Sequence, residues 1–83
     1  MPSELECAME SLITMFHRYA GKDTNTLSRR ELRELMENEL STFLKEDPAA
    51  VDKIMKDLDT ERKDVLDFDM FLSLLARFLM ANN

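Results

Sequence analysis

Residues 27–40 (LSRRELRELMENEL) and 66–79 (LDFDMFLSLLARFL) are two versions of one helical segment, and they decide the fold. In both segments the apolar residues recur at the spacing of one helix face. A shift of 39 residues along the chain places five pairs in register: Leu27 with Leu66, Glu31 with Met70, Leu32 with Phe71, Leu35 with Leu74 and Met36 with Leu75. The chain is therefore one structural unit repeated.

Two capping-box patterns mark where helices start in the first unit. Ser3 with Glu6, and Ser28 with Glu31, have the spacing at which each side chain bonds the other residue's free backbone N–H. They predict a first helix that ends near Tyr19 and a second that follows a polar loop.

The second unit should follow a hinge at residues 41–47. Asp47 and Pro48 are typical of an N-cap and a first helical residue. A charged loop at residues 59–67 then separates the third helix from a fourth, whose apolar residues cover more than one side. We predict an all-α fold of four helices in two EF-hand-like helix–loop–helix units, with one domain over residues 1–83: unit one at 3–40, the hinge at 41–47 and unit two at 48–83.

The composition favours a small binding protein. A chain of 83 residues buries a thin core, so a partner subunit would add stability. Its net charge of −6 disfavours nucleic acid and anionic membranes as direct ligands, and it suits cations or basic helices. No apolar run has the length of a membrane-spanning helix, and the N-terminus lacks the pattern of a signal peptide. We expect a cytoplasmic protein without direct membrane insertion.

Catalysis has little support in the sequence. The single cysteine, Cys7, cannot form an internal disulfide, and the single histidine, His17, cannot form a zinc site alone. The two lie about 15 Å apart along one helix, so neither can activate the other. We expect no enzymatic activity and no cofactor.

The second loop departs from a calcium-binding EF-hand. Such a loop offers oxygen ligands at positions 1, 3, 5, 7, 9 and 12 and has glycine at position 6. Counted from Asp59, the loop has Lys63 at position 5, Asp64 in place of the glycine and Met70 in place of the final glutamate. Its eighth residue, Leu66, is aliphatic like Leu27, and these residues pair across the two loops of an EF-hand protein. We expect no binding at physiological calcium.

The first loop has one acid in a ligand position. Counted from Ala20, it has Lys22 at position 3, Thr24 at position 5 and Glu31 at position 12. Glu31 can serve as a calcium ligand or as the capping partner of Ser28, and we favour capping. If calcium binds weakly, the candidate ligands are Glu31, Asp59, Glu61 and Asp67.

The segments 2–22 (PSELECAMESLITMFHRYAGK), 27–40 and 50–59 (AVDKIMKDLD) resemble the S-100 family of small dimeric EF-hand proteins. The resemblance runs over residues 2–76 and is greatest to the members that act as the light chain of an annexin. It implies a homodimer in which the first and fourth helices of both subunits form an X-shaped bundle. The candidate interface residues, which can equally form the core of one chain, are Leu5, Met9, Leu12, Ile13, Phe16, Phe71, Leu74, Leu75 and Phe78.

The resemblance also implies a groove for a partner helix. In calcium-dependent members, ion binding swings the third helix away and opens a groove for an amphipathic helix. Members of the annexin-light-chain type have damaged loops and stay open without calcium. Matching positions place the acids at the polar ends of the bound helix and the apolar residues on its hydrophobic face: Glu6, Met9, Glu10, Phe43, Leu44, Phe78, Leu79 and Met80.

Three functions remain in competition. The leading hypothesis is a calcium-insensitive S-100-type adaptor that binds an amphipathic helix of a protein such as an annexin, and so reaches membranes only through that partner. The alternatives are a calcium sensor with weak sites, and a truncated family member without a retained target, because the sequence stops at Asn83 where the family continues. Arg77 also stands where the family has a small residue, and it must extend outward or find an acid.

Overall fold

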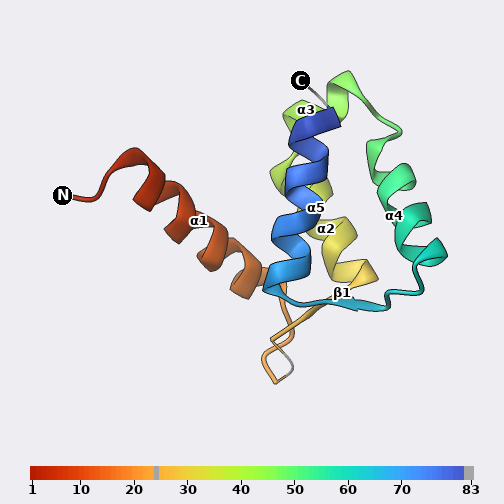
Figure 1. The fold of residues 1–83 in the computed structure, drawn as a ribbon, viewed down its shortest axis with the longest axis horizontal. Coiled ribbons are helices and arrows are strands. Elements are labelled where there is room, and N and C mark those ends of the chain that lie inside the picture. The colour runs from red at the N-terminus through yellow and green to blue at the C-terminus, as the bar shows by residue number, and fades with distance from the viewer. Residues whose placement is uncertain (24, 82–83) are drawn as a thin grey trace.

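The structure is a computed structural model that describes residues 1–23 and 25–81. Within these residues there are five helices and one two-stranded sheet (Figure 1). In chain order they are α1 (Glu4–Tyr19), β1 (Leu27–Ser28), α2 (Arg29–Glu39), α3 (Ser41–Glu46), α4 (Ala50–Thr60), β2 (Val65–Leu66) and α5 (Phe68–Ala81). The predicted all-α fold of two helix–loop–helix units is confirmed, with an extra short helix between the units.

Both predicted capping boxes are present. Ser3 Oγ accepts a hydrogen bond from the Glu6 backbone nitrogen at 3.1 Å, and Glu6 Oε1 accepts one from the Ser3 nitrogen at 3.0 Å. Ser28 and Glu31 make the same pair of bonds at 3.2 Å and 2.8 Å. Each box satisfies two of the backbone N–H groups that a helix start leaves free.

The start of α5 repeats the start of α2 with different chemistry. Asp67 lies at the position equivalent to Ser28, and its Oδ1 accepts a hydrogen bond from the Met70 nitrogen at 2.9 Å. Aspartate and serine are interchangeable as N-caps because both present an oxygen at the same reach. The internal repeat therefore includes the caps as well as the apolar positions.

The two loops are joined by the predicted pair of aliphatic residues. β1 and β2 are antiparallel, with Leu27 opposite Leu66 and Ser28 opposite Val65. The side chains of Leu27 and Leu66 are completely buried. This short sheet ties the two units together at one end of the molecule.

One core holds α2, α4, α5 and the end of α1 together. Phe16, in the last turns of α1, lies with its ring centroid 5.2 Å from that of Phe68 and 5.6 Å from that of Phe71. The remainder of α1 extends away from this body, as Figure 1 shows. The buried apolar residues are Phe16, Leu27, Leu32, Leu35, Met36, Ala50, Val51, Met55, Leu58, Leu66, Phe71, Leu74 and Phe78.

The hinge differs from the prediction in two respects. The expected irregular segment forms helix α3, and α4 begins at Ala50 with Ala49 as its N-cap, two residues later than Pro48. The reason is a turn at Asp47, whose backbone oxygen accepts a hydrogen bond from the Ala50 nitrogen at 3.1 Å. The Asp47 carboxylate lies 4.0 Å from Lys53 Nζ, so it pairs with a cation on α4 instead of capping the helix.

Candidate functional site

The first part of the second loop is the C-terminal cap of α4. The Arg62 nitrogen donates to the Asp59 oxygen at 3.1 Å, and the Lys63 nitrogen donates to the Leu58 oxygen at 2.9 Å. Arg62 has a φ of 58°, in the left-handed region. These features define a Schellman motif, the commonest way in which a helix satisfies its last carbonyl groups. Residues 59–63 are thus used to end a helix and do not wrap around a central ion.

Asp64, which stands at the position of the EF-hand glycine, does not adopt the left-handed conformation of that glycine. In the second loop, the described non-glycine residue with positive φ is Arg62, two positions earlier, because α4 continues through Thr60 before the chain turns. The first loop keeps the EF-hand position: Asn25, the sixth residue counted from Ala20, has a φ of 55°. Asparagine tolerates this conformation better than most residues.

The acids at positions 1 and 3 of the second loop are paired with side-chain cations. Asp59 forms an ion pair with Arg29, the first residue of α2. Glu61 lies 3.0 Å from Lys63 Nζ and 3.4 Å from Arg77 Nη1 on α5. The hydrogen bond and the charge of Lys63, followed by the smaller effect of Arg77, lower the pKa of Glu61 below its usual 4.5. Of the two outcomes predicted for Arg77, an outward extension or an acidic partner, the structure shows the acidic partner.

The four weak calcium candidates are engaged elsewhere. Glu31 and Asp67 accept hydrogen bonds from backbone nitrogens at the starts of α2 and α5, while Asp59 and Glu61 carry the ion pairs above. Within residues 1–23 and 25–81, no three His, Cys, Asp or Glu side chains converge on a point that could hold a metal ion. Thr24, expected at position 5 of the first loop, lies outside the described residues.

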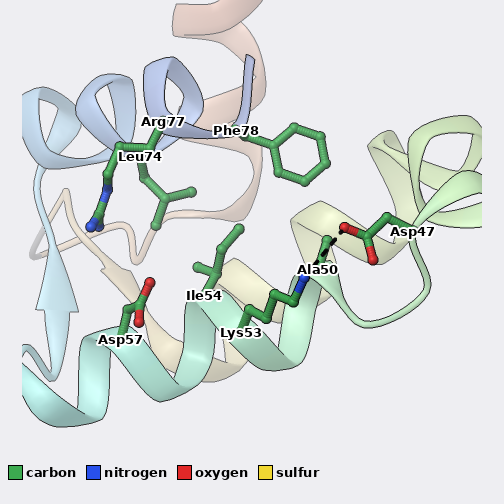
Figure 2. A pocket seen from close by; sticks show the side chains of 8 residues that line it. All are labelled: Asp47, Ala50, Lys53, Ile54, Asp57, Leu74, Arg77 and Phe78. Atoms are coloured by element: carbon green, nitrogen blue, oxygen red, sulfur yellow. Dashed lines mark ion pairs between the residues drawn. The ribbon is translucent and has the colours of Figure 1, made fainter. Parts of the chain in front are cut away.

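A groove with an apolar floor lies between α4 and α5. It encloses a cavity of about 200 Å³. Figure 2 shows Ile54 of α4 pointing toward Leu74 and Phe78 of α5, with charged side chains around this floor. The lining residues are Asp47, Ala50, Lys53, Ile54, Asp57, Leu74, Arg77 and Phe78. An apolar floor with a charged rim suits the amphipathic helix of a partner.

The hinge helix α3 contacts α5 at Phe78, a residue of this groove. The rings of Phe43 on α3 and Phe78 on α5 meet edge to face, with centroids 5.7 Å apart. Phe43 remains partly exposed, Leu44 is half-buried, and Leu79 and Met80 are exposed. Of the predicted partner-binding residues of the hinge and of α5, Phe43 and Phe78 thus contact each other, and Phe78 lines the groove.

The predicted partner-binding residues of α1 lie elsewhere. Glu6, Met9 and Glu10 are exposed on the arm that leaves the body, so one chain does not bring them to the groove (Figure 1). The candidate dimer residues divide in the same way. Leu5, Met9 and Ile13 are exposed, Leu12 and Leu75 are partly buried, and Phe16, Phe71, Leu74 and Phe78 are buried in the core of the chain itself.

Sequence reasoning missed the role of Arg29. Besides its ion pair with Asp59, its Nε donates to the Lys63 backbone oxygen at 3.3 Å, so α2 holds the second loop from the side. Arg29 follows the buried Leu27 and the N-cap Ser28. A cation at a helix start, where the helix dipole disfavours it, is the signal that could have suggested an acidic neighbour from another element.

Two helix–loop–helix units joined through Leu27 and Leu66 define a paired EF-hand protein. Residues 5–47 match the S-100/ICaBP type calcium binding domain. The chain belongs to the S-100 family. It is 51% identical to Protein S100-A10 of Rattus norvegicus, covering all of this chain and 88% of the relative, and 48% identical to Protein S100-A10 of Homo sapiens, covering all of this chain and 87% of the relative. S100-A10 is the calpactin light chain, so the predicted resemblance is confirmed.

The fold agrees with a solved member of the family. The solution structure of S100A5 in its calcium-bound states superimposes with a TM-score of 0.74 at 35% identity, covering all of this chain and 91% of that one. None of the helices in the described part of the chain is long and apolar enough to cross a membrane.

Proposed function

We propose that this protein is a calcium-insensitive S-100-type adaptor: a homodimer that binds an amphipathic helix of a partner protein, such as the N-terminal helix of an annexin. One observation carries the proposal. The groove between α4 and α5 is open while Asp59 and Glu61 of the second loop form ion pairs with Arg29, Lys63 and Arg77. The positive charge that a calcium ion supplies in other EF-hands is supplied here by side chains.

The exposed face of α1 supports the homodimer. Leu5, Met9 and Ile13 follow one another at intervals of four residues and are 70%, 53% and 45% exposed. These positions form one stripe along a helix that makes few contacts with its own body. A stripe of large apolar side chains in water is unfavourable, and a second copy of the chain would cover it.

Charge and shape support the helical partner. The floor formed by Ile54, Leu74 and Phe78 fits the apolar face of a helix, and the net charge of −6 favours a helix with basic residues on its polar face. In the homodimer, Glu6 and Glu10 of α1 add acids to the rim. An annexin is favoured as the partner protein because the chain resembles the calpactin light chain. We place the complex in the cytoplasm, at membranes only through the partner.

The test is a calorimetric titration of synthetic annexin N-terminal helix peptides into the purified protein in EGTA. Saturable binding to a dimer is expected. Ile54→Glu, which puts a charge on the groove floor, should weaken it at least tenfold, since burying an unpaired charge is costly. Val65→Glu is the matched control, because Val65 is exposed on β2 and does not line the groove. Loss of binding in the control but not in Ile54→Glu would place the site elsewhere, and absence of binding to every annexin peptide would refute the annexin assignment.

A calcium sensor is the second candidate. The similarity to S100A5 in its calcium-bound states favours it, because the two backbones agree over all of this chain. A calcium-dependent change in circular dichroism would support this function, and unchanged spectra would support the calcium-insensitive adaptor.

A further inference from the structure

Glu61 connects three parts of the second unit. It follows the last turn of α4, its carboxylate lies 3.0 Å from Lys63 Nζ within the loop, and it lies 3.4 Å from Arg77 Nη1 near the end of α5. All three side chains line a cavity of about 380 Å³ between the loop and α5. We call these three residues the charged clasp.

Arg77 also belongs to the groove. It lines the cavity under the loop and the cavity between α4 and α5, and Leu74 is the other residue that lines both. In Figure 2 its guanidinium points away from Phe78, toward the end of the groove at which Asp57 lies. The ion pair with Glu61 therefore joins the α4 side and the α5 side of the groove at this end.

The charged clasp links the second loop to α5, as a calcium ion links the loop to the exiting helix in other EF-hands. In a calcium-binding EF-hand the ion bridges acids of the loop to the glutamate that starts the exiting helix. Here Met70 stands at that glutamate's position, and the link from the loop to the exiting helix is made two turns later by Arg77. On the basis of the proposed function, we propose that Arg77 is a positioning residue: its ion pair with Glu61, which directly follows α4, holds α4 relative to α5 so that the groove stays open without calcium.

The expected effect is on the groove more than on stability. Both partners are partly exposed to water, and exposed ion pairs contribute little to the free energy of folding. A small free-energy bias is still sufficient to shift the equilibrium between an open and a closed groove, if the two arrangements differ little in free energy. Without the clasp, α4 can move until Ile54 meets Leu74 and the apolar floor is covered.

The test measures the open groove directly, without any partner. Nile red, an uncharged dye that fluoresces on apolar surfaces, is titrated in EGTA against the wild-type chain, Glu61→Gln and Arg77→Gln. Each substitution should lower the dye affinity about twofold to fivefold, the range that an exposed ion pair can supply. Glu37→Gln is the control: it makes the same charge change at an exposed acid on α2 that forms no ion pair with any described residue and does not line the groove, and it should leave the affinity unchanged.

A charge exchange separates the ion pair from a packing role of Arg77. The triple variant Glu61→Lys, Lys63→Glu and Arg77→Glu reverses every charge of the clasp and so restores both ion pairs, and it should recover most of the dye affinity. Equal affinities in all variants would overturn the proposal, and so would single-variant losses that the exchange fails to recover. Circular dichroism shows whether each variant is folded. If Arg77→Gln is unfolded, the dye affinities of Glu61→Gln and of the charge-exchange variant test the proposal. Because no partner helix is used, a failure here is distinct from failure to bind an annexin peptide.

Discussion

The carboxylate of Glu31 lies 2.8 Å from the backbone nitrogen of Ser28, and the Ser28 hydroxyl accepts a hydrogen bond from the Glu31 nitrogen in return. Glu31 is the residue that would grip calcium with two oxygens in a standard loop. Here one of these oxygens holds the start of α2. The residue that could bind an ion is thus part of the helix cap.

This cap gives the first prediction. Ser28→Ala removes the hydroxyl and should lower the free energy of unfolding by about 1 kcal/mol, the usual cost of losing an N-cap. The measurement is urea unfolding at one fixed protein concentration. Ser11→Ala, an exposed change in the middle of α1, should have no such cost because alanine is favoured within helices. Equal losses of unfolding free energy in both variants would contradict the role of Ser28 as the N-cap of α2.

The turn at Arg62 gives a prediction of the opposite sign. Arg62 occupies the left-handed region at φ 58°, where side chains other than glycine cost about 1–2 kcal/mol. Arg62→Gly should therefore raise the free energy of unfolding by about 1 kcal/mol. Arg30→Gly, the same substitution at an exposed position within α2, should lower it. A loss of stability in Arg62→Gly would show that the helix cap is wrongly placed.

The exposed stripe of α1 predicts how the dimer can be broken. Ile13→Glu should shift the protein to monomers in sedimentation equilibrium at micromolar concentration, because it puts a charge in the centre of the proposed interface. Thr14→Glu places the same side chain at an exposed position outside the stripe, about 100° around α1 from Ile13, and should leave the dimer intact. A wild-type chain that is monomeric under these conditions would refute the homodimer.

The charged clasp also has a pH signature. The pKa of Glu61 is lowered below 4.5, chiefly by its hydrogen bond to Lys63 and the charge of that residue. A lowered pKa means that the stabilisation is fully present above pH 4.5 and is lost as the pH falls through the lowered value. Wild type should thus melt above Glu61→Gln at pH 7, and the two melting temperatures should converge well below pH 4.5. A difference that persists in acid would show that the ion pairs are not its cause.

The sequence predicted the parts of the fold that depend on local or repeated patterns. The capping boxes of Ser3 and Ser28 were found because a serine and a glutamate three residues apart bond only their own helix start. The pairing of Leu27 with Leu66 was found because the repeat placed both at the same loop position. These features require no knowledge of how distant elements pack.

The remaining features depend on contacts between distant segments. α4 extends through Thr60, so the left-handed residue that follows it is Arg62, two positions before Asp64 at the EF-hand glycine position. The pairing of Arg29 with Asp59 requires that α2 lie beside the second loop. For Arg77 the sequence indicated either an outward extension or an acidic partner, while the choice of Glu61 followed from the fold. Long charged side chains have many partners within reach, and the tertiary arrangement selects one.

The most direct test of the central claim is a calorimetric titration of calcium into chelator-treated protein. No saturable heat is expected at micromolar to millimolar calcium. The reason is that Glu31 and Asp67 already accept hydrogen bonds at helix starts, while Asp59 and Glu61 form ion pairs. Saturable heat with a micromolar midpoint would contradict it and would make the protein a calcium sensor.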